Sequence, residues 1–245
     1  MGTAAALRLG AATCTLLAAA LAGAAPARAQ ADDIEVSPRL ELLSDAEIAQ
    51  RLSFIEGRLE AGKTYAQVWQ YGWTGIYTVT AIAGAYGAIT ADDGDARALS
   101  IVSGVKSALA AADLIGNPLP ARLGAAPLAA VQGTGRDAQL QRLALGERAL
   151  LDNAELADRR YDLRPHVQNV TVNAIGGLLV WYFGNSTDAL VSLVGGVAVG
   201  EAQIWSQPWR ASADLREYRG EFPGAIAEGW ELRPRLNGAE LAYHF

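Results

Sequence analysis

The sequence has 245 residues, of which 51% are apolar and 19% charged, so it holds enough apolar material for one domain with a sizeable core. A formal net charge of −6 and a pI near 5.0 argue against nucleic acid as a partner. The single cysteine, Cys14, lies near the N-terminus, so residues 30–245 contain no thiol for a disulfide, a metal ligand or a nucleophile.

Residues 1–29 have the order of a secretory signal peptide. Arg8 precedes a charge-free run rich in Ala and Leu at 11–25, and Ala27-Arg28-Ala29 has the small-residue pattern of a cleavage site. An uncleaved membrane anchor is the alternative, but the apolar run is short for a span. We therefore expect an exported protein of the bacterial periplasm or cell envelope, whose residues 30–43 form a flexible N-terminal segment.

The next part of the chain predicts an amphipathic helix followed by an apolar helical hairpin. Residues 44–47 have capping-box spacing, and apolar residues then recur at helical intervals as far as Leu59. No charged residue occurs at 64–91. After a polar loop at 92–95, a second apolar helix at 98–115 completes the hairpin.

The second half of the chain predicts the same order of elements. A connection rich in Pro, Ala and Gly at 117–135 leads to an amphipathic helix at 137–160. A charge-free helix at 167–183 and its partner at 188–206 then form another apolar hairpin, which a proline at position 208 ends. We interpret residues 44–210 as a duplicated helical bundle.

The two copies of this bundle are 44–122 and 137–210, and the duplication is the main internal feature of the sequence. Gly104 of the first copy corresponds to Gly195 of the second, and Pro118 to Pro208. The alternative is that any two alanine-rich hairpins look alike. Small residues spaced by four predict close contact faces between helices: Ser100, Gly104, Ala108 and Ala112, and Ser192, Gly196 and Gly200.

The last segment, 211–245, is expected to be a linker and a short β-hairpin. Asn237-Gly238 is a type I′ turn signal, and alternating residues on both sides predict strands with Arg235 opposite Glu240. The fold class that we expect is therefore mainly α: a helical bundle from two copies of an amphipathic helix plus an apolar hairpin, with a C-terminal β-hairpin.

The apolar hairpins leave open whether the protein enters a membrane. Their length and their interfacial aromatic residues favour membrane spans, whereas the polar residues within them, such as Thr78, Thr80 and Lys106, favour a soluble bundle. Export would also place the arginine-rich middle of the chain outside the cell, against the positive-inside rule. Membrane association stays undecided at this point, and an envelope protein or a lipid is the expected kind of partner.

No catalytic motif is evident. The two histidines, His166 and His244, lack a second ligand at metal-binding spacing, and no nucleophile elbow, phosphate loop or dinucleotide fingerprint is present. We expect no metal and no cofactor.

Some polar and aromatic residues in apolar surroundings are candidates for binding a ligand. Each has a structural alternative: the aromatic residues as core, Glu201 exposed or paired with an arginine such as Arg210, and the polar stripe at 166–173 bonded to the neighbouring amphipathic helix. The candidates are Trp69, Trp73, Tyr77, His166, Asn169, Asn173, Trp181 and Glu201.

Three hypotheses for function follow from these residues. The first is a non-enzymatic structural or interaction protein of the cell envelope, associated with the membrane through the apolar hairpins. The second is a periplasmic carrier that binds a lipid or another apolar ligand in a cavity lined by the aromatic residues. The third is an enzyme that uses Glu201 or His166, which requires these two side chains to face one another in a cleft.

Overall fold

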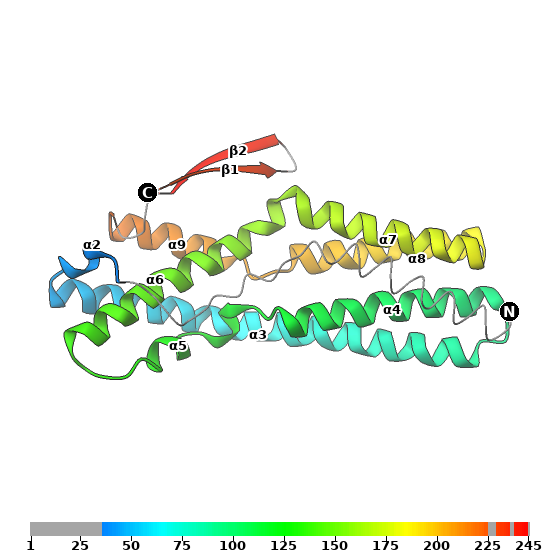
Figure 1. Ribbon diagram of the computed structural model, residues 1–245, viewed down its shortest axis with the longest axis horizontal. Helices are drawn as coiled ribbons and strands as arrows, with labels where there is room; N and C mark the ends of the chain where they lie inside the picture. Colours follow the sequence, from blue (N-terminus) through cyan, green and yellow to red (C-terminus); the bar gives the residue numbers. More distant parts are fainter. Residues whose placement is uncertain (1–35, 225–228, 236–237, 245) are drawn as a thin grey trace. The chain divides into compact units, whose positions relative to one another are not determined.

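A computed structural model describes residues 36–224 and the backbone of residues 229–235 and 238–244. The predicted signal peptide lies outside these residues, so export and cleavage stay predictions. In chain order the elements are α2 (Pro38–Glu41), α3 (Asp45–Thr90), α4 (Gly94–Gly116), η1 (Pro120–Leu123), α5 (Ala126–Ala129), α6 (Arg136–Asp158), η2 (Arg159–Tyr161), α7 (Leu163–Phe183), α8 (Ser186–Trp205), α9 (Arg210–Glu221), β1 (Gly229–Arg235) and β2 (Gly238–His244) (Figure 1). The expectation of a mainly helical protein is confirmed.

The helical part of the chain divides into two compact units, and each unit takes segments from both halves of the sequence. Unit 1 contains residues 70–118 and 164–206, which are the two apolar hairpins. Unit 2 contains residues 36–69, 119–163 and 207–224, and includes the two amphipathic helices. Helix α3 contributes its first part to unit 2 and its second part to unit 1.

Unit 2 begins with the capping box that the sequence predicts. The backbone N–H of Ser44 donates to Glu47 Oε2 at 2.9 Å, and the N–H of Glu47 donates to Ser44 Oγ at 3.3 Å. These bonds satisfy donors that the first turn of α3 leaves without a helical acceptor. They also lower the pKa of Glu47. The predicted start of the first amphipathic helix is therefore confirmed.

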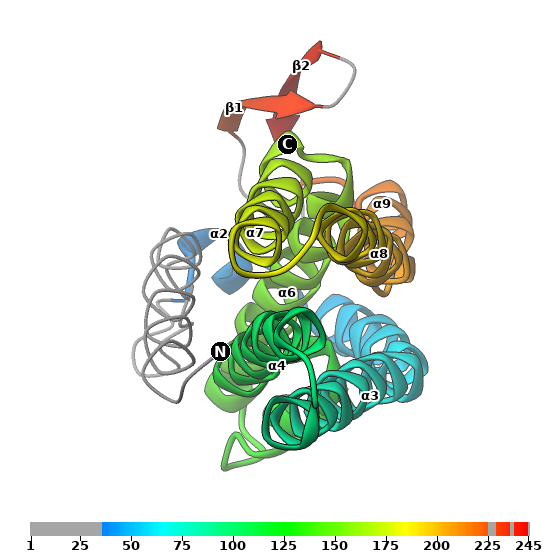
Figure 2. The ribbon, with the colours of Figure 1, turned by 90° about the vertical axis from the view of Figure 1, so that its right-hand side faces the viewer.

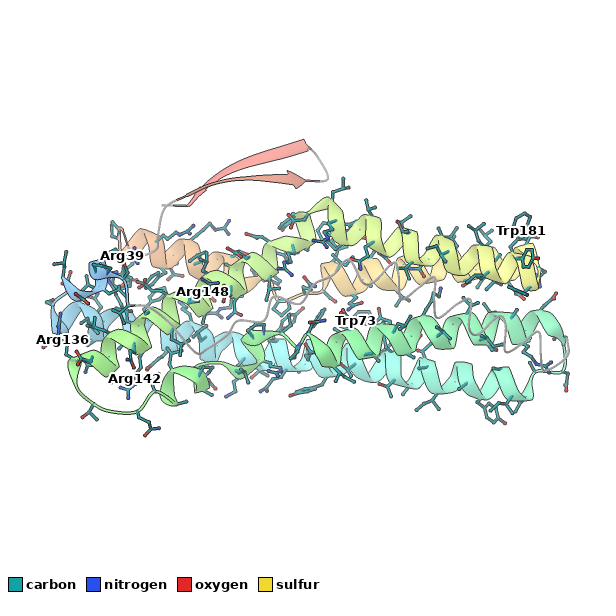
Figure 3. The ribbon with its side chains drawn as sticks, viewed as in Figure 1. Arg39, Trp73, Arg136, Arg142, Arg148 and Trp181 are labelled. Carbon is teal, nitrogen blue, oxygen red and sulfur yellow. The ribbon has the colours of Figure 1, made fainter. Side chains whose placement is uncertain are left out.

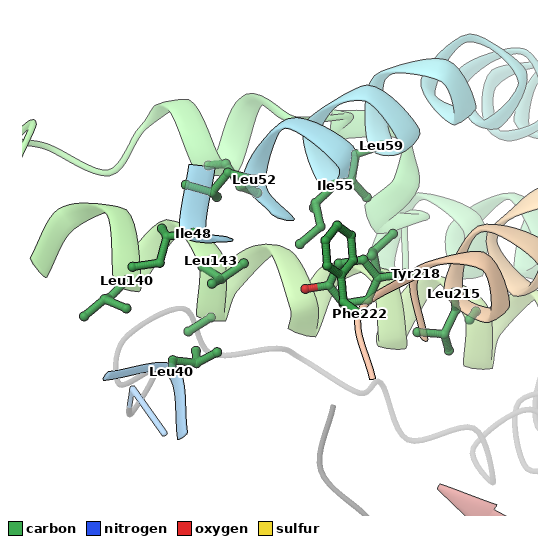
Figure 4. Packing of buried hydrophobic residues seen from close by; sticks show 14 residues of the cluster. Leu40, Ile48, Leu52, Ile55, Leu59, Leu140, Leu143, Leu215, Tyr218 and Phe222 are labelled. Carbon is green, nitrogen blue, oxygen red and sulfur yellow. The ribbon is translucent and has the colours of Figure 1, made fainter. Parts of the chain in front are cut away.

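The core of unit 2 is formed by apolar stripes from α3, α6 and α9, joined by Leu40 of α2 (Figure 4). Leu215 and Tyr218 of α9, and Phe222 directly after it, recur at intervals of three and four residues and are buried. Our expectation that the segment after position 210 begins as a linker was wrong, because this short stripe gives α9 an apolar face to bury. Residues 38–41, expected in a flexible segment, form a helical turn that buries Leu40.

Unit 1 is a bundle of α4, α7, α8 and the second part of α3, seen end on in Figure 2. Helices α3 and α4 approach most closely at Gly84 and Gly104, where a Cβ on Gly84 would overlap the backbone of Gly104. The predicted contact face is thus confirmed at Gly104 and at Ser100, which lies against Gly87. It was wrong for Ala108 and Ala112, which are exposed, because the contact ends within two turns.

The two predicted copies differ where the amphipathic helix meets the apolar one. In the first copy both belong to the continuous 46-residue helix α3, whereas in the second copy η2 separates α6 from α7. Pro165 explains the break, because proline disfavours helical geometry in the residue before it and suits the first turn of a new helix. The first copy has no proline at this place. The duplication itself stays a prediction.

For the C-terminal hairpin, the structure describes the backbone pairing, whereas the expected pattern of side chains stays a prediction. The backbones of β1 and β2 run antiparallel with Arg235 opposite Gly238. The register that we expected, with Arg235 opposite Glu240, was wrong by two residues, because Gly238 belongs to β2 instead of to the turn. Side chains beyond position 224 lie outside the described residues, so the expected apolar and charge-paired faces of the hairpin are not tested.

Replacing Gly84 tests the close approach of α3 and α4. We expect Gly84→Ala to lower the free energy of unfolding by about 1–3 kcal/mol, because the new Cβ pushes the two backbones apart. Gly75→Ala in the same helix is the matched control, since nothing lies within 4 Å of a Cβ there. It should be neutral or stabilising by up to roughly 1 kcal/mol. Thermal unfolding of the purified chain gives both values, and equal effects would contradict the contact.

Candidate functional site

Helices α7 and α8 of unit 1 interlock through asparagines and glycines. Asn169 and Asn173 lie one turn apart on α7, and Gly200 and Gly196 lie one turn apart on α8. A Cβ on Gly196 would overlap the side-chain amide of Asn173, and a Cβ on Gly200 would overlap that of Asn169. The two glycines therefore supply the space in which the two amide groups sit.

The amide groups belong to a continuous chain of hydrogen bonds that begins on α4. Lys106 Nζ donates to Asn173 Oδ1 at 2.9 Å and to the hydroxyl and carbonyl oxygens of Ser192 at 3.2 Å each. Asn173 Nδ2 in turn donates to the carbonyl oxygen of Asn169 at 2.9 Å. The lone ammonium group of α4 is thus satisfied by three oxygens from α7 and α8 without a carboxylate.

At the other end, this chain of hydrogen bonds reaches a carboxylate. Asn169 Nδ2 donates to Glu201 Oε1 at 2.9 Å, His166 Nδ1 is hydrogen-bonded to Glu201 Oε2 at 2.7 Å, and Trp205 Nε1 donates to Oε2 at 3.2 Å. His166 and Asn173 are each only 7% exposed. We call this set the polar ladder: Lys106, His166, Asn169, Asn173, Ser192 and Glu201.

The structure therefore brings four of the predicted ligand-binding residues into one cluster: His166, Asn169, Asn173 and Glu201. Glu201 pairs with His166 of α7 instead of an arginine such as Arg210. Asn169 and Asn173 of the stripe at 166–173 bond to α8 and α4. The glycines of α8 allow these contacts, because they let the polar side chains of α7 approach it closely.

The predicted aromatic residues do not gather around one cavity. Tyr77 donates its hydroxyl to Gln203 Oε1 at 2.6 Å and Trp73 donates Nε1–H to Ser206 Oγ at 3.0 Å, so both tie α3 to α8. Trp181 lies at the other end of unit 1 from Trp73 and is 61% exposed (Figure 3). Trp69 is buried in unit 2. These contacts give Trp73 and Tyr77 a structural role.

Unit 2 contains a second buried polar cluster around Glu147. Tyr218 donates its hydroxyl to Glu147 Oε1 at 2.7 Å, Arg39 donates to Oε2 at 2.9 Å, and Arg51 lies 3.5 Å from Oε1. Burial raises the pKa of Glu147 even though both arginines act to lower it. The carboxylate thus joins α2, α3, α6 and α9 within one unit.

Sequence reasoning missed Glu147, and a signal for it was present. It lies four residues after Leu143 and three before Leu150, so it interrupts the apolar face of an amphipathic helix. Lys106 gave a similar signal as the lone cation in an apolar helix, and we counted it only as evidence against a membrane. The groups that bond to Glu147 and Lys106 lie on other helices, far away in the chain. A single sequence does not reveal such contacts.

The ladder offers acid–base chemistry but no metal centre. His166 and Glu201 face one another, which is one part of what the enzyme hypothesis requires, and the N–H groups of Asn169 and Trp205 hold the carboxylate in place. Within the described residues, no group of three or more His, Cys, Asp or Glu side chains could share a metal ion. No protein-family model, curated protein or solved structure matches the chain, so the contacts alone carry the functional argument.

Removing one amide tests the polar ladder. We expect Asn173→Leu to destabilise unit 1 by about 2 kcal/mol, because Lys106 loses an acceptor for a charge-assisted hydrogen bond. Asn117→Leu, at the exposed end of α4, is the matched control and should change stability by less than about 0.5 kcal/mol. Thermal unfolding of the purified variants decides the matter. If the ladder contributes little to stability, both substitutions will lower the melting temperature by similar, small amounts.

The raised pKa of Glu147 makes the stability of unit 2 depend on pH. A carboxyl group with a raised pKa in the folded state contributes most when protonated, below its unfolded pKa near 4.5, and loses this contribution as the pH rises through the folded value. We therefore expect the stability of the native chain relative to Glu147→Gln to fall as the pH rises above about 4.5. The stability of unit 2 in both proteins can be measured by hydrogen exchange of the α6 and α9 amides, corrected for intrinsic exchange rates. A constant difference would be inconsistent with the raised pKa.

Proposed function

We propose that the protein is a non-enzymatic structural or interaction protein of the bacterial cell envelope, anchored by unit 1 in a lipid bilayer while unit 2 stays in water. The main support is the distribution of apolar side chains over the described residues. Of 24 exposed large apolar side chains, 17 belong to unit 1, whereas 18 of the 24 buried apolar residues belong to unit 2. Unit 2 buries its apolar residues as a soluble protein does, and unit 1 presents them outward.

Helix length and hydropathy support the same proposal. Two helical stretches, Gly94–Gly116 and the one that begins at Ser186, are long and apolar enough to cross a membrane, with mean hydropathies of 1.5 and 1.3. A span of the hydrocarbon core needs about 20 residues. In the most apolar 18 residues of each stretch, only 33% are buried for Gly94–Gly116 and only 11% for the stretch that begins at Ser186. The core helix of a soluble protein is mostly buried.

Several of the polar residues that argue against a membrane are hydrogen-bonded inside unit 1. The hydroxyl groups of Thr74, Thr78 and Thr80 each donate to the carbonyl four residues earlier at 2.7–2.9 Å. Gln70 donates to the carbonyl of Leu114 at 2.7 Å, and the ladder residues bond to one another. Because the cost of a polar group in lipid comes mainly from unpaired donors and acceptors, these bonds remove much of the objection.

Chain connectivity gives the proposed anchor a simple topology. Each hairpin leaves unit 2 and returns to it, so a hairpin that crosses the bilayer puts its tip on the opposite side. Both tips are polar, and Asn185 Nδ2 of one donates to Asp95 Oδ2 of the other at 2.9 Å. The predicted signal peptide would place unit 2 outside the inner membrane. An envelope partner or a lipid would then meet unit 2.

Lysine substitutions on exposed positions test the anchor. We expect Val79→Lys and Ile82→Lys, at side chains 67% and 65% exposed, to make the protein extractable by alkaline carbonate, because a lysine at the centre of a span costs about 2.5–3.5 kcal/mol. Leu42→Lys in unit 2, at a side chain 88% exposed, is the matched control and should leave the protein in the membrane. Cell fractionation followed by immunoblotting measures the retained share.

The native chain sets the reference for this experiment. Retention of the native protein through carbonate, and release only by detergent, is the result that the proposal requires. Recovery of the native protein in the soluble fraction would refute the membrane anchor, and the exposed apolar surface of unit 1 would then point to contacts with another protein.

A further inference from the structure

A pocket of about 340 Å³ lies within unit 2, apart from the polar ladder. Side chains from α3, α6 and the start of α9 line it, and most of them are apolar. Its volume is at the lower end of the range for small-molecule sites, so it suits a compact chemical group. The lining residues that carry the argument are Arg58, Tyr65, Trp209, Arg210 and Asp214.

Arg210 offers this pocket accessible donors for an anion. Its Nε donates to both carboxylate oxygens of Asp214, at 3.3 and 3.2 Å, and within the described residues its side chain forms no other hydrogen bond. The two terminal nitrogens therefore keep their donors, and the side chain is 46% exposed. A guanidinium that is held on one edge by a carboxylate presents a planar fork, which can bind a phosphate through two parallel hydrogen bonds.

The other charged groups of the pocket do not oppose an anion beside Arg210. The lining side chains carry two positive charges, on Arg58 and Arg210, and one negative charge, on Asp214. The Asp214 carboxylate is only 8% exposed and also lies 3.6 Å from Arg58, so it presents little negative charge to a ligand. Arg58 pairs in addition with Glu217, outside the lining. Arg210 is thus the lining arginine whose donors are available.

Exposed aromatic rings give the pocket an apolar surface beside this cation. Trp209 is 57% exposed and Tyr65 is 49% exposed, so both rings are accessible to a ligand while they line the pocket. Tryptophan and tyrosine rings beside a concave site favour contact with the apolar part of a bound molecule. An arginine next to such rings suits a ligand that has both a phosphate and an apolar body.

The place of these residues in the chain indicates where such a ligand would come from. Tyr65 precedes by five residues the start of unit 1 at position 70, and Trp209 follows by three residues its end at position 206. If unit 1 crosses a bilayer, the chain leaves the hydrocarbon core at these two positions, at the level of the lipid headgroups. Tryptophan, tyrosine and arginine side chains are favoured at that level.

We propose that this pocket binds the headgroup of one anionic phospholipid, whose phosphate accepts hydrogen bonds from Arg210 while Trp209 and Tyr65 contact the glycerol and the first carbons of the acyl chains. The choice of a lipid as the source of the phosphate rests on the proposed membrane anchor of unit 1. The site itself belongs to unit 2 and gives that unit a binding activity of its own.

Three probes test the proposal on the full chain in a neutral detergent: dihexanoylphosphatidylglycerol, dihexanoylglycerol, which has the same acyl chains without a phosphate, and inorganic phosphate. Isothermal titration calorimetry, corrected by a titration into detergent alone, gives the affinity of each probe. We expect the phospholipid to bind at least about tenfold more tightly than dihexanoylglycerol, the effect of hydrogen bonds between charged groups. Inorganic phosphate, which lacks the apolar part, should bind more weakly than the phospholipid.

Matched variants assign the binding to this pocket. Arg210→Gln should remove the preference for the phospholipid and leave the affinity for dihexanoylglycerol unchanged, whereas Arg216→Gln, at an exposed position of α9 outside the lining, should keep the preference. Trp209→Ala, which removes no ion pair, should weaken binding of both lipids. Trp181→Ala, at an exposed ring in unit 1, should weaken neither. Melting temperatures without a probe show whether each variant is folded.

The titrations and the membrane experiment have separate outcomes. Equal affinities for the two lipids, a preference that survives Arg210→Gln, inorganic phosphate that binds as tightly as the phospholipid, or no saturable binding of either lipid would overturn the pocket proposal. None of these results depends on whether the native chain resists carbonate. Release by carbonate would refute the membrane anchor alone, because the titrations use detergent-solubilised protein and short-chain lipids.

Discussion

The fold of unit 1 depends on backbone-to-side-chain contacts between α7 and α8, because its large apolar side chains point outward. The buried apolar cluster of this unit is small, with Ala98, Val102 and Val180 as its fully buried members. In its place, Gly196 and Gly200 receive two asparagines, and Gly84 meets Gly104. Helices that lack an apolar core between them can associate through such close contacts and through interhelical hydrogen bonds, which is the way helices pack in lipid.

Unit 2, unlike unit 1, buries its large apolar side chains in a core. Helix α3 belongs to both units and shows both arrangements. In its first part, Ile48, Ile55 and Leu59 point into a core shared with α6 and α9. In its second part, Val79 and Ile82 are exposed. The same helical backbone therefore changes from burying its apolar residues to presenting them. This change in one continuous helix is an additional argument for the proposed membrane anchor.

Local signals in the sequence predicted the elements better than their partners. The capping box at 44–47 and the two hairpins depend on neighbouring residues, and the structure contains them. Helix α9 was missed because three apolar residues over two turns give a weak periodic pattern beside the strong ones. The pairing of Glu201 with His166 entered only as a requirement of the enzyme hypothesis, and the partners of Glu147 could not be predicted, because such partners depend on which helix faces lie opposite one another.

The charged ends of the polar ladder solve a problem of register that the glycines alone leave open. Asn169 and Asn173 are spaced by four residues, and so are Ser192, Gly196 and Gly200. If α8 slid by one turn, Asn169 would meet Gly196 and Asn173 would meet Ser192, with small residues still opposite both amides. Glu201, however, would move away from His166, and Ser192 would move away from Lys106. Because an ionisable group left unpaired between helices is costly, the bonds of Lys106 and Glu201 select one register out of several that are sterically similar. A polar ladder in an apolar hairpin thus has a structural explanation before any catalytic one.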